Sequence, residues 1–339
     1  MRPFTYTRAT TVEEAIQAYT RAASPRESRT PSRDIRFLGG GTNLLDLMKM
    51  GVEQPVQLID INHLPLSTIE EHQGGVRIGA MATNTDAANH ELIRTRYPVL
   101  SEAILAGASP QLRNKATMGG NLLQRTRCYY FYDPSYQECN KRNPGSGCAA
   151  KNGYNRIHAI LGAGEECIAV HPSDMCVALV ALDAVVRVKG PQGERLIPMT
   201  EFHRLPGSTP QIDTNLHPGE LITAIDIPAM PYAKRSTYLK VRDRNSYAFA
   251  LVSVAAAIDL DDHGTIRRAH IALGGVAHKP WRAFKAERAL AGRKPQEATL
   301  RAAAGAELAG ARPYHDNGFK VELARRSIVR AVTTAVNLA

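Results

Sequence analysis

Cysteine is absent from most of this sequence. The chain has 339 residues, and all its cysteines lie in one segment, at Cys128, Cys139, Cys148, Cys167 and Cys176. Thiols that serve as ordinary core residues would be scattered through a fold. Their confinement therefore indicates one local site that uses several of them.

Long apolar runs and basic runs are also missing. The longest apolar stretch, AFALVSVAAAIDL, is shorter than the ~20 residues that a membrane-spanning helix needs. The net charge of +10 is spread along the chain among acidic residues. This pattern disfavours nucleic-acid binding and suits an anionic cofactor or acidic partner subunits. The opening residues, MRPFTYTRATTVEEA, lack the apolar core of a secretory signal. We therefore predict no membrane insertion, no nucleic-acid partner and no export signal on this chain.

The sequence has no arrangement typical of an independent catalytic centre. We find no Ser/His/Asp set, no paired carboxylates and no histidine-rich metal motif. His171, which precedes Pro172, is interpreted as a structural loop residue. The chemistry of this chain is therefore expected to come from cofactors.

The segment that carries the cysteines, CYYFYDPSYQECNKRNPGSGCAAKNGYN, has little helix or strand pattern and contains several glycines and prolines. Such a loop gains order from whatever its sulfurs bind. Four thiolates can hold a [4Fe–4S] cluster or a tetrahedral zinc ion. The spacing C-x10-C-x8-C-x18-C is wider than the paired cysteines of most zinc sites, which favours the cluster. Zinc, or two disulfides with one free thiol, remain alternatives.

Cys176 differs from the other four cysteines. It lies in SDMCVALVALDAVV, where Ser173 and Asp174 are good N-cap residues for an apolar helix. A cysteine in such a helix behaves as a small buried apolar residue. We therefore predict that the metal ligands are Cys128, Cys139, Cys148 and Cys167, in a loop inserted at about residues 125–167.

Periodicity predicts an α+β protein with a domain boundary near Pro228 to Pro231, giving domains 1–230 and 231–339. Thr11 and Glu14 form a capping box for an opening helix. Helical spacing continues in DAANHELIRTRYPVLSEAIL, RAFKAERALAG and VELARRSIVRAVTTAV. Strands are predicted at IRFL, VQLIDI, GVRIGAM, IHAIL, CIAVHP, AVVRVKG and ELITAIDIP. The segments TYLKVRDR, AFALVSVAAAIDL and TIRRAHIALGGVA predict an antiparallel meander.

Two glycine-rich loops form the second motif. In GGGTN, which follows a predicted strand, bare backbone N–H groups could surround phosphate oxygens. The loop is not a G-x-G-x-x-G fingerprint, and by itself it fits a tight turn equally well. The second loop, TMGGN, lies shortly after Arg113, which could instead form a surface salt bridge. Together, two such loops suit the two ends of a dinucleotide.

Three segments, FLGGGTNLLDLMK, LRNKATMGGNLLQ and HPSDMCVALVALDA, resemble the FAD-binding subunits of the xanthine dehydrogenase and aldehyde oxidoreductase family. The resemblance spans essentially the whole chain. It implies a FAD-binding domain of the vanillyl-alcohol-oxidase and p-cresol-methylhydroxylase type, with two α/β subdomains. It also implies a C-terminal domain like that of the carbon monoxide dehydrogenase flavoprotein. The cysteine insertion resembles the FAD and [4Fe–4S] subunit of periplasmic aldehyde oxidoreductases. The 4-hydroxybenzoyl-CoA reductases, with other cysteine spacings, are more distant.

Carried over by position, the resemblance implies a set of FAD contacts. The first loop would cradle the pyrophosphate through Leu38, Gly39, Gly40, Gly41, Thr42, Asn43 and Leu44. The second loop would lie against the flavin and phosphates through Thr117, Gly119, Gly120 and Asn121, with Ser109 and Arg113 nearby. Asp174 would bind a sugar or ribityl hydroxyl, Ile222 would contact the flavin ring, and Lys240 would lie near the anionic reduced flavin.

The resemblance further implies an electron-transfer subunit of a molybdenum hydroxylase. FAD would receive electrons from two [2Fe–2S] clusters of a small partner and pass them to an external acceptor. Aldehyde oxidation would occur on a large partner that holds molybdopterin cytosine dinucleotide. We expect cofactor loading in the cytoplasm, then export to the periplasm on a partner's twin-arginine signal, with the cytoplasm as the alternative location. A stand-alone FAD oxidase and a zinc-bearing assembly subunit are the competing functions.

Overall fold

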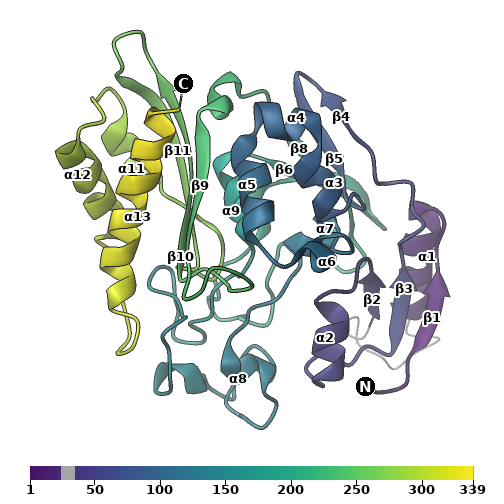
Figure 1. The fold of residues 1–339 in the computed structure, drawn as a ribbon. Helices are drawn as coiled ribbons and strands as arrows, with labels where there is room; N and C mark the ends of the chain where they lie inside the picture. The colour runs from purple at the N-terminus through teal and green to yellow at the C-terminus, as the bar shows by residue number, and fades with distance from the viewer. Residues whose placement is uncertain (24–34, 339) are drawn as a thin grey trace.

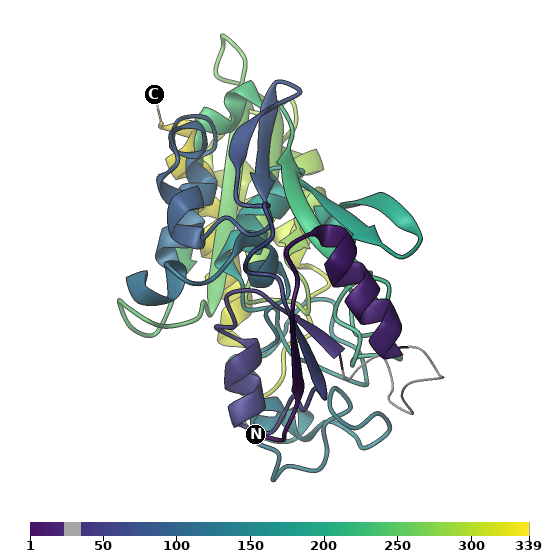
Figure 2. The ribbon, with the colours of Figure 1, turned by 90° about the vertical axis from the view of Figure 1, so that its right-hand side faces the viewer.

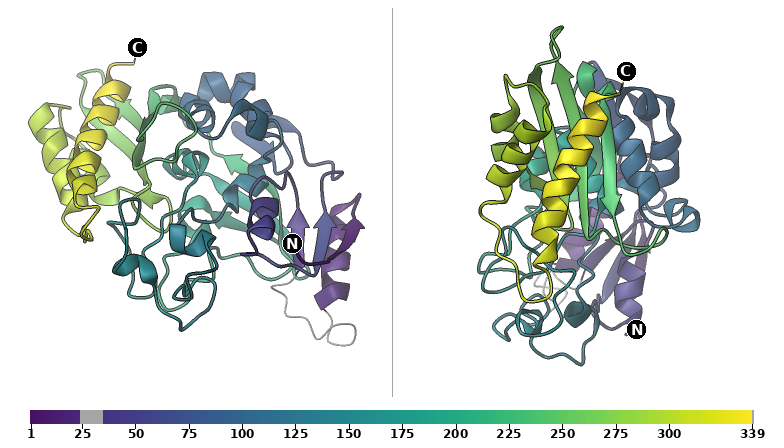
Figure 3. Two further views of the ribbon diagram at one scale, coloured as in Figure 1. Left: turned by 60° about the horizontal axis from the view of Figure 1, so that its bottom comes forward. Right: turned by 60° about the vertical axis from the view of Figure 1, so that its left-hand side comes forward.

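The computed structural model describes residues 1–23 and 35–338 (Figure 1). Its strands form three sheets that lie in a row, with the N-terminal sheet at one end and the C-terminal sheet near the other (Figure 3). The irregular cysteine insertion lies along one side of this row, below the middle and C-terminal sheets in Figure 1. In the described part of the chain, no helix is long and apolar enough to cross a lipid bilayer.

The N-terminal sheet is parallel, in the order β1-β3-β2, and packs beside helix α1 (Figure 2). Its elements are β1 (Thr5–Arg8), α1 (Val12–Ala23), β2 (Ile35–Leu38), α2 (Leu44–Lys49) and β3 (Gln57–Asp60). The predicted capping box of α1 is confirmed. The Glu14 N–H donates to Thr11 Oγ1 at 3.1 Å, and the Thr11 N–H donates to Glu14 Oε2 at 3.2 Å.

The middle sheet has five antiparallel strands in the order β4-β5-β8-β6-β7. They are β4 (Ile69–His72), β5 (Gly75–Gly79), β6 (Val185–Gly190), β7 (Gly193–Pro198) and β8 (Leu221–Ile227). The associated helices are α3 (Asn84–Asn89), α4 (Glu91–Arg96), α5 (Pro98–Ala106), α6 (Pro110–Arg113), α7 (Met118–Leu122), α9 (Asp174–Ala181) and α10 (Met199–Phe202). The helical segment predicted between residues 86 and 105 is broken into three helices. His90 is extended, and Tyr97 precedes Pro98, which disfavours helical geometry at Tyr97.

The C-terminal sheet is the predicted antiparallel meander, in the order β12-β11-β10-β9. Its elements are η3 (Pro231–Lys234), β9 (Ser236–Val241), β10 (Val252–Leu260), β11 (Ile266–Gly274), β12 (Trp281–Arg282), α11 (Phe284–Leu290), α12 (Glu297–Leu308) and α13 (Phe319–Val336). Strand β10 is buried almost throughout, because α9 covers one face of the sheet and α13 the other. Its run of alanines allows both helices to approach closely.

The insertion contains only α8 (Tyr129–Tyr132) and the 3-10 helix η2 (Ala149–Lys151) among its described residues. The strands predicted at IHAIL and CIAVHP are wrong. The Ala159 N–H bonds to Ile168 O at 2.9 Å, whereas the N–H groups of Ile160 and Leu161 both bond to Val276 O. The backbone of this segment therefore pairs with the β11–β12 connection, so no regular ladder forms.

Candidate cofactor sites

The first glycine loop leaves β2 and leads into α2. Gly41 has φ of +73°, a left-handed conformation that favours glycine. Within the described chain, the backbone N–H groups of Gly40, Gly41, Thr42 and Asn43 donate to no protein acceptor. A row of free N–H groups is a suitable surface for phosphate oxygens.

The second glycine loop packs directly on the first. A Cβ atom placed on Gly40 would lie 2.1 Å from Lys115 O, and one on Gly39 would lie 3.2 Å from Thr117 Oγ1. The sequence interpretation assigned Gly40 to contact with a phosphate. In the structure this glycine permits the contact between the two loops, which are about 75 residues apart in the chain. Thr117 also caps α7, because its Oγ1 accepts the Gly120 N–H at 3.1 Å.

The Asn121 side chain fixes the second loop to the start of α9. Its Nδ2 donates to Asn84 Oδ1 at 2.8 Å, and its Oδ1 accepts from Ser173 Oγ at 2.6 Å. Ser173 is the predicted N-cap of α9, and its Oγ accepts the Cys176 N–H at 3.1 Å. Gly119 contributes close packing, since a Cβ there would lie 3.0 Å from the Cβ of Ala80.

Asp174 and Lys240, both expected to contact FAD, form a buried ion pair with each other. Lys240 Nζ lies 2.8 Å from Asp174 Oδ2 and 3.0 Å from Ala106 O, and both side chains are more than nine-tenths buried. Tyr238 Oη donates to Asp174 Oδ1 at 2.6 Å. Burial and the neighbouring Asp174 carboxylate raise the pKa of Tyr238 well above its ordinary value, so the phenol stays a donor.

This ion pair yields a stability prediction. In the Lys240→Met variant, Asp174 would remain buried without its cation, and we expect the free energy of unfolding to fall by about 3–5 kcal/mol. The double variant Asp174→Asn, Lys240→Met should recover part of this loss, because no uncompensated charge remains. Tyr238→Phe, which removes one hydrogen bond, should cost less than Lys240→Met. Urea titration of the three variants measures this order, and an unchanged midpoint for Lys240→Met would contradict it.

Three other expected contacts have structural roles. Ser109 caps α6, accepting the Leu112 N–H at 3.3 Å. Arg113 Nη1 donates to Gly107 O at 2.6 Å and so braces the turn in which Ala108 has φ of +52°. Among the described residues Arg113 forms no ion pair, so its alternative role as a salt-bridge residue is not observed. Ile222 is buried in β8.

Asn43 joins the first glycine loop to the cysteine insertion. Its Nδ2 donates to Tyr132 Oη at 3.0 Å, and its Oδ1 accepts the Arg125 N–H at 2.9 Å. Leu44 begins α2. The end of the first loop and the start of the insertion are therefore held by the same side chain.

A buried charge network that the sequence did not reveal surrounds Arg125. Arg125 pairs with Glu53 and with Asp213, and Asp213 also pairs with the buried Lys141 of the insertion. Burial opposes ionisation of Asp213, but Lys141 and Arg125 outweigh it and hold the pKa of Asp213 well below its ordinary range. These residues are far apart in sequence and share no motif, so no local signal could have grouped them.

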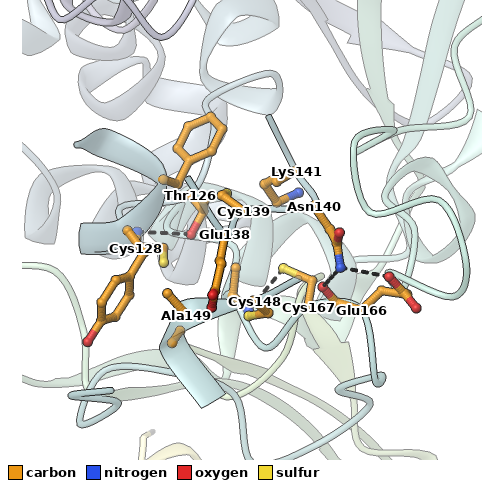
Figure 4. A pocket seen from close by; sticks show the side chains of 14 residues that line it. Thr126, Cys128, Glu138, Cys139, Asn140, Lys141, Cys148, Ala149, Glu166 and Cys167 are labelled. Atoms are coloured by element: carbon orange, nitrogen blue, oxygen red, sulfur yellow. Dashed lines mark hydrogen bonds between the residues drawn. The ribbon is translucent and has the colours of Figure 1, made fainter. Parts of the chain in front are cut away.

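The four predicted ligand cysteines line one cavity in the insertion (Figure 4). Each is a free thiol, so the disulfide alternative is not observed. Burial raises the pKa of Cys128 to about 12 and that of Cys167 to about 11, and it also raises the pKa of Cys148. The nearby Lys141 offsets only part of the effect of burial at Cys167, so the buried thiols stay protonated, whereas a bound metal would stabilise the thiolates.

Two groups in the structure approach the sulfur atoms of the cavity cysteines. His158, which is almost fully buried, places Nε2 3.1 Å from Cys128 Sγ. The Ala169 N–H donates to Cys167 Sγ at 3.5 Å. Cys176 lies elsewhere, fully buried on α9 as the sequence predicted.

The fold, with two packed glycine loops before an antiparallel C-terminal domain, defines a class of flavoprotein. The family model for the FAD binding domain in molybdopterin dehydrogenase matches residues 2–230, and that for the CO dehydrogenase flavoprotein C-terminal domain matches residues 237–336. The chain therefore belongs to the FAD-binding subunits of the molybdenum hydroxylase family and is an oxidoreductase subunit. The expected α+β fold is confirmed.

Individual relatives refine this class. The chain is 51% identical to the aldehyde oxidoreductase FAD-binding subunit PaoB of Escherichia coli K12, over 99% of both chains. It is 28% identical to the glyceraldehyde dehydrogenase medium chain of Sulfolobus acidocaldarius, over 86% of this chain and 82% of that one. Among solved structures, it is similar to the reconstituted CO dehydrogenase from Oligotropha carboxidovorans, with a TM-score of 0.76, 25% identity and full coverage of both chains.

Proposed function

We propose that this chain is the FAD- and [4Fe–4S]-containing electron-transfer subunit of a heterotrimeric molybdenum hydroxylase that oxidises aldehydes to carboxylic acids. Electrons from the [2Fe–2S] clusters of a small partner would pass through FAD to an external acceptor. The observation that carries the proposal is a cavity lined by four cysteines, in an insertion that Asn43 joins to the first of two packed glycine loops.

The first glycine loop supports FAD binding by its chemistry. Its free N–H groups suit the pyrophosphate, and Thr117 and Asn121 supply polar atoms on the adjoining loop. Bound FAD would supply two-electron chemistry and exchange with one-electron carriers. The role of this chain is to hold the dinucleotide in a fixed position. The Asp174–Lys240 pair would lie near it, in agreement with the positions implied by the family resemblance.

The spacing of the four cavity cysteines favours an iron–sulfur cluster over zinc. The C-x10-C-x8-C-x18-C spacing is wider than the paired cysteines of most zinc sites, and it suits the larger cubane cluster. A bound cluster would carry single electrons. Cys128, Cys139, Cys148 and Cys167 would hold it.

The proposed aldehyde substrate and partner subunits are inferred from similar proteins. The names of two relatives state aldehyde oxidoreductase and glyceraldehyde dehydrogenase activities. The described part of this chain contains no arrangement of residues that would itself oxidise an aldehyde, so oxidation is assigned to a large molybdenum-containing partner.

Optical spectroscopy of the purified chain, followed by substrate addition, tests the proposal. We expect a flavin spectrum with a broad iron–sulfur shoulder near 400 nm, and no bleaching by aldehyde without oxygen. The flavin should bleach when the assembled complex receives aldehyde. Bleaching of the isolated chain would indicate a stand-alone oxidase, and a colourless protein would indicate an assembly subunit.

The proposed location is the periplasm, reached by export of the assembled complex on a partner's twin-arginine signal. The basis is the family resemblance of the insertion. Cell fractionation after expression of all subunits tests this location. We expect the complex in the periplasm and the chain alone in the cytoplasm. Recovery of the assembled complex only in the cytoplasm would refute export without affecting the electron-transfer role.

His158 provides a prediction about the cluster. Because its Nε2 lies 3.1 Å from Cys128 Sγ, a hydrogen bond to this sulfur would stabilise the more negative reduced cluster. In His158→Leu we expect the reduction potential of the cluster to fall by on the order of 60 mV, the equivalent of a tenfold change for one electron. His158→Gln, which retains an N–H donor, should stay closer to the wild-type potential. Redox titration followed by electron paramagnetic resonance measures this difference, and equal potentials for all three proteins would contradict it.

A further inference from the structure

Three side chains that can ligate a metal meet near the second glycine loop, and none of them lines the cysteine cavity. They are His171, Cys176 and His203, and one ligand atom of each lies within 4.8 Å of the others. Cys176 and His203 are more than nine-tenths buried, and His171 is half-buried. The three residues come from different segments: the chain before α9, the first turn of α9 and the end of α10.

The histidine rings leave nitrogen atoms without partners. His203 Nε2 lies 2.8 Å from Leu122 O, so this nitrogen carries the proton and Nδ1 keeps a free lone pair. Among the described residues, neither His203 Nδ1 nor His171 Nε2 has a hydrogen-bond partner, although both are buried. The two ring centroids are only 4.1 Å apart. A buried polar atom without a partner is unfavourable, so two in adjacent rings require an explanation.

The surroundings of His203 are typical of a metal ligand. Histidine ligands usually donate their second ring nitrogen to a carbonyl or carboxylate, which fixes the ring and its tautomer. The bond from His203 to Leu122 O fulfils this role and anchors the ring to the last residue of α7. Cys176 would lose its proton to solvent on metal binding, and its thiolate would offset one of the two positive charges.

We propose that His171, Cys176 and His203 bind one zinc ion. Two imidazole nitrogens and one thiolate are ligands that zinc prefers, and three protein ligands leave a fourth position for water. The ion would fasten the segment between the insertion and α9 to α9 itself and to the end of α10, near the TMGGN loop. The site is independent of the cysteine cavity and of the function proposed above.

Zinc analysis of the purified, cofactor-loaded protein tests this site. After incubation with zinc sulfate and removal of unbound ions, we expect about one zinc per chain in the wild type. Zinc content should fall at least tenfold in Cys176→Ser and in His203→Phe, with iron and FAD contents retained. The variant His263→Ala, which alters an exposed histidine in the β10–β11 turn, should keep its zinc.

X-ray absorption at the zinc edge identifies the ligands independently of folding. The wild type should show one sulfur at about 2.3 Å and nitrogen or oxygen ligands at about 2.0 Å. Four sulfur ligands would place zinc in the cysteine cavity and overturn the proposal. It would equally be overturned by trace zinc in the wild type, or by full zinc in both Cys176→Ser and His203→Phe.

Discussion

Replacement of any one of the four cavity cysteines by serine is expected to reduce the iron content from about four atoms per chain to nearly none. A serine hydroxyl is a poor substitute for a thiolate ligand, and the insertion has little regular structure to hold the remaining three in place. The broad absorbance near 400 nm should disappear while FAD remains. Iron analysis and the visible spectrum of Cys128→Ser, Cys139→Ser, Cys148→Ser and Cys167→Ser measure this effect.

Cys176→Ser is the matched control for this experiment. Cys176 is fully buried on α9 and does not line the cavity, so this variant should keep its iron. On the proposal of a separate zinc site, the same variant should lose zinc, so the two metals respond to different cysteines. Iron loss in Cys176→Ser with full iron in Cys167→Ser would show that the ligand set is wrong.

The second large effect is expected from Gly40→Val. The Cβ of any larger residue would lie 2.1 Å from Lys115 O and 3.1 Å from the Cα of Ala116, so the two glycine loops would have to separate. Both loops are proposed to bind the same dinucleotide. We therefore expect FAD occupancy to fall at least tenfold, as measured by flavin released per chain.

Gly305→Ala is the control for Gly40→Val, because a Cβ at Gly305 meets no atom within 4 Å and the residue lies in α12. This variant should retain its FAD. Full FAD occupancy in Gly40→Val would mean that the packing of the two loops is not needed for flavin binding.

Features that depend on neighbouring residues were predicted well from the sequence. The capping box of α1 and the N-cap of α9 were expected, because each rests on side chains a few positions apart. The antiparallel C-terminal meander was expected from strand segments that follow one another in the chain. The prediction of strands at IHAIL and CIAVHP was wrong. Apolar composition alone does not distinguish a strand from a buried irregular segment whose partner, here Val276 O, lies elsewhere in the chain.

The sequence did not predict which charged residues, far apart in the chain, form ion pairs. Asp174 and Lys240 were both assigned to the cofactor, but nothing in the sequence indicated that these residues, 66 positions apart, form a buried pair. The Arg125, Glu53 and Asp213 network was likewise unexpected. Charged residues acquire partners through burial, which the local pattern does not specify.

The sequence by itself determined the two glycine loops, the set of four cysteines and the separate nature of Cys176, because these depend on residue type and local spacing. Only the tertiary structure decided that Gly40 permits loop packing, that His158 approaches the sulfur of Cys128, and that His171 lies beside His203. Such contacts join segments that are distant in the chain. They form only when the sheets and helices pack, and the physical reason is that burial and packing, not local propensity, select these partners.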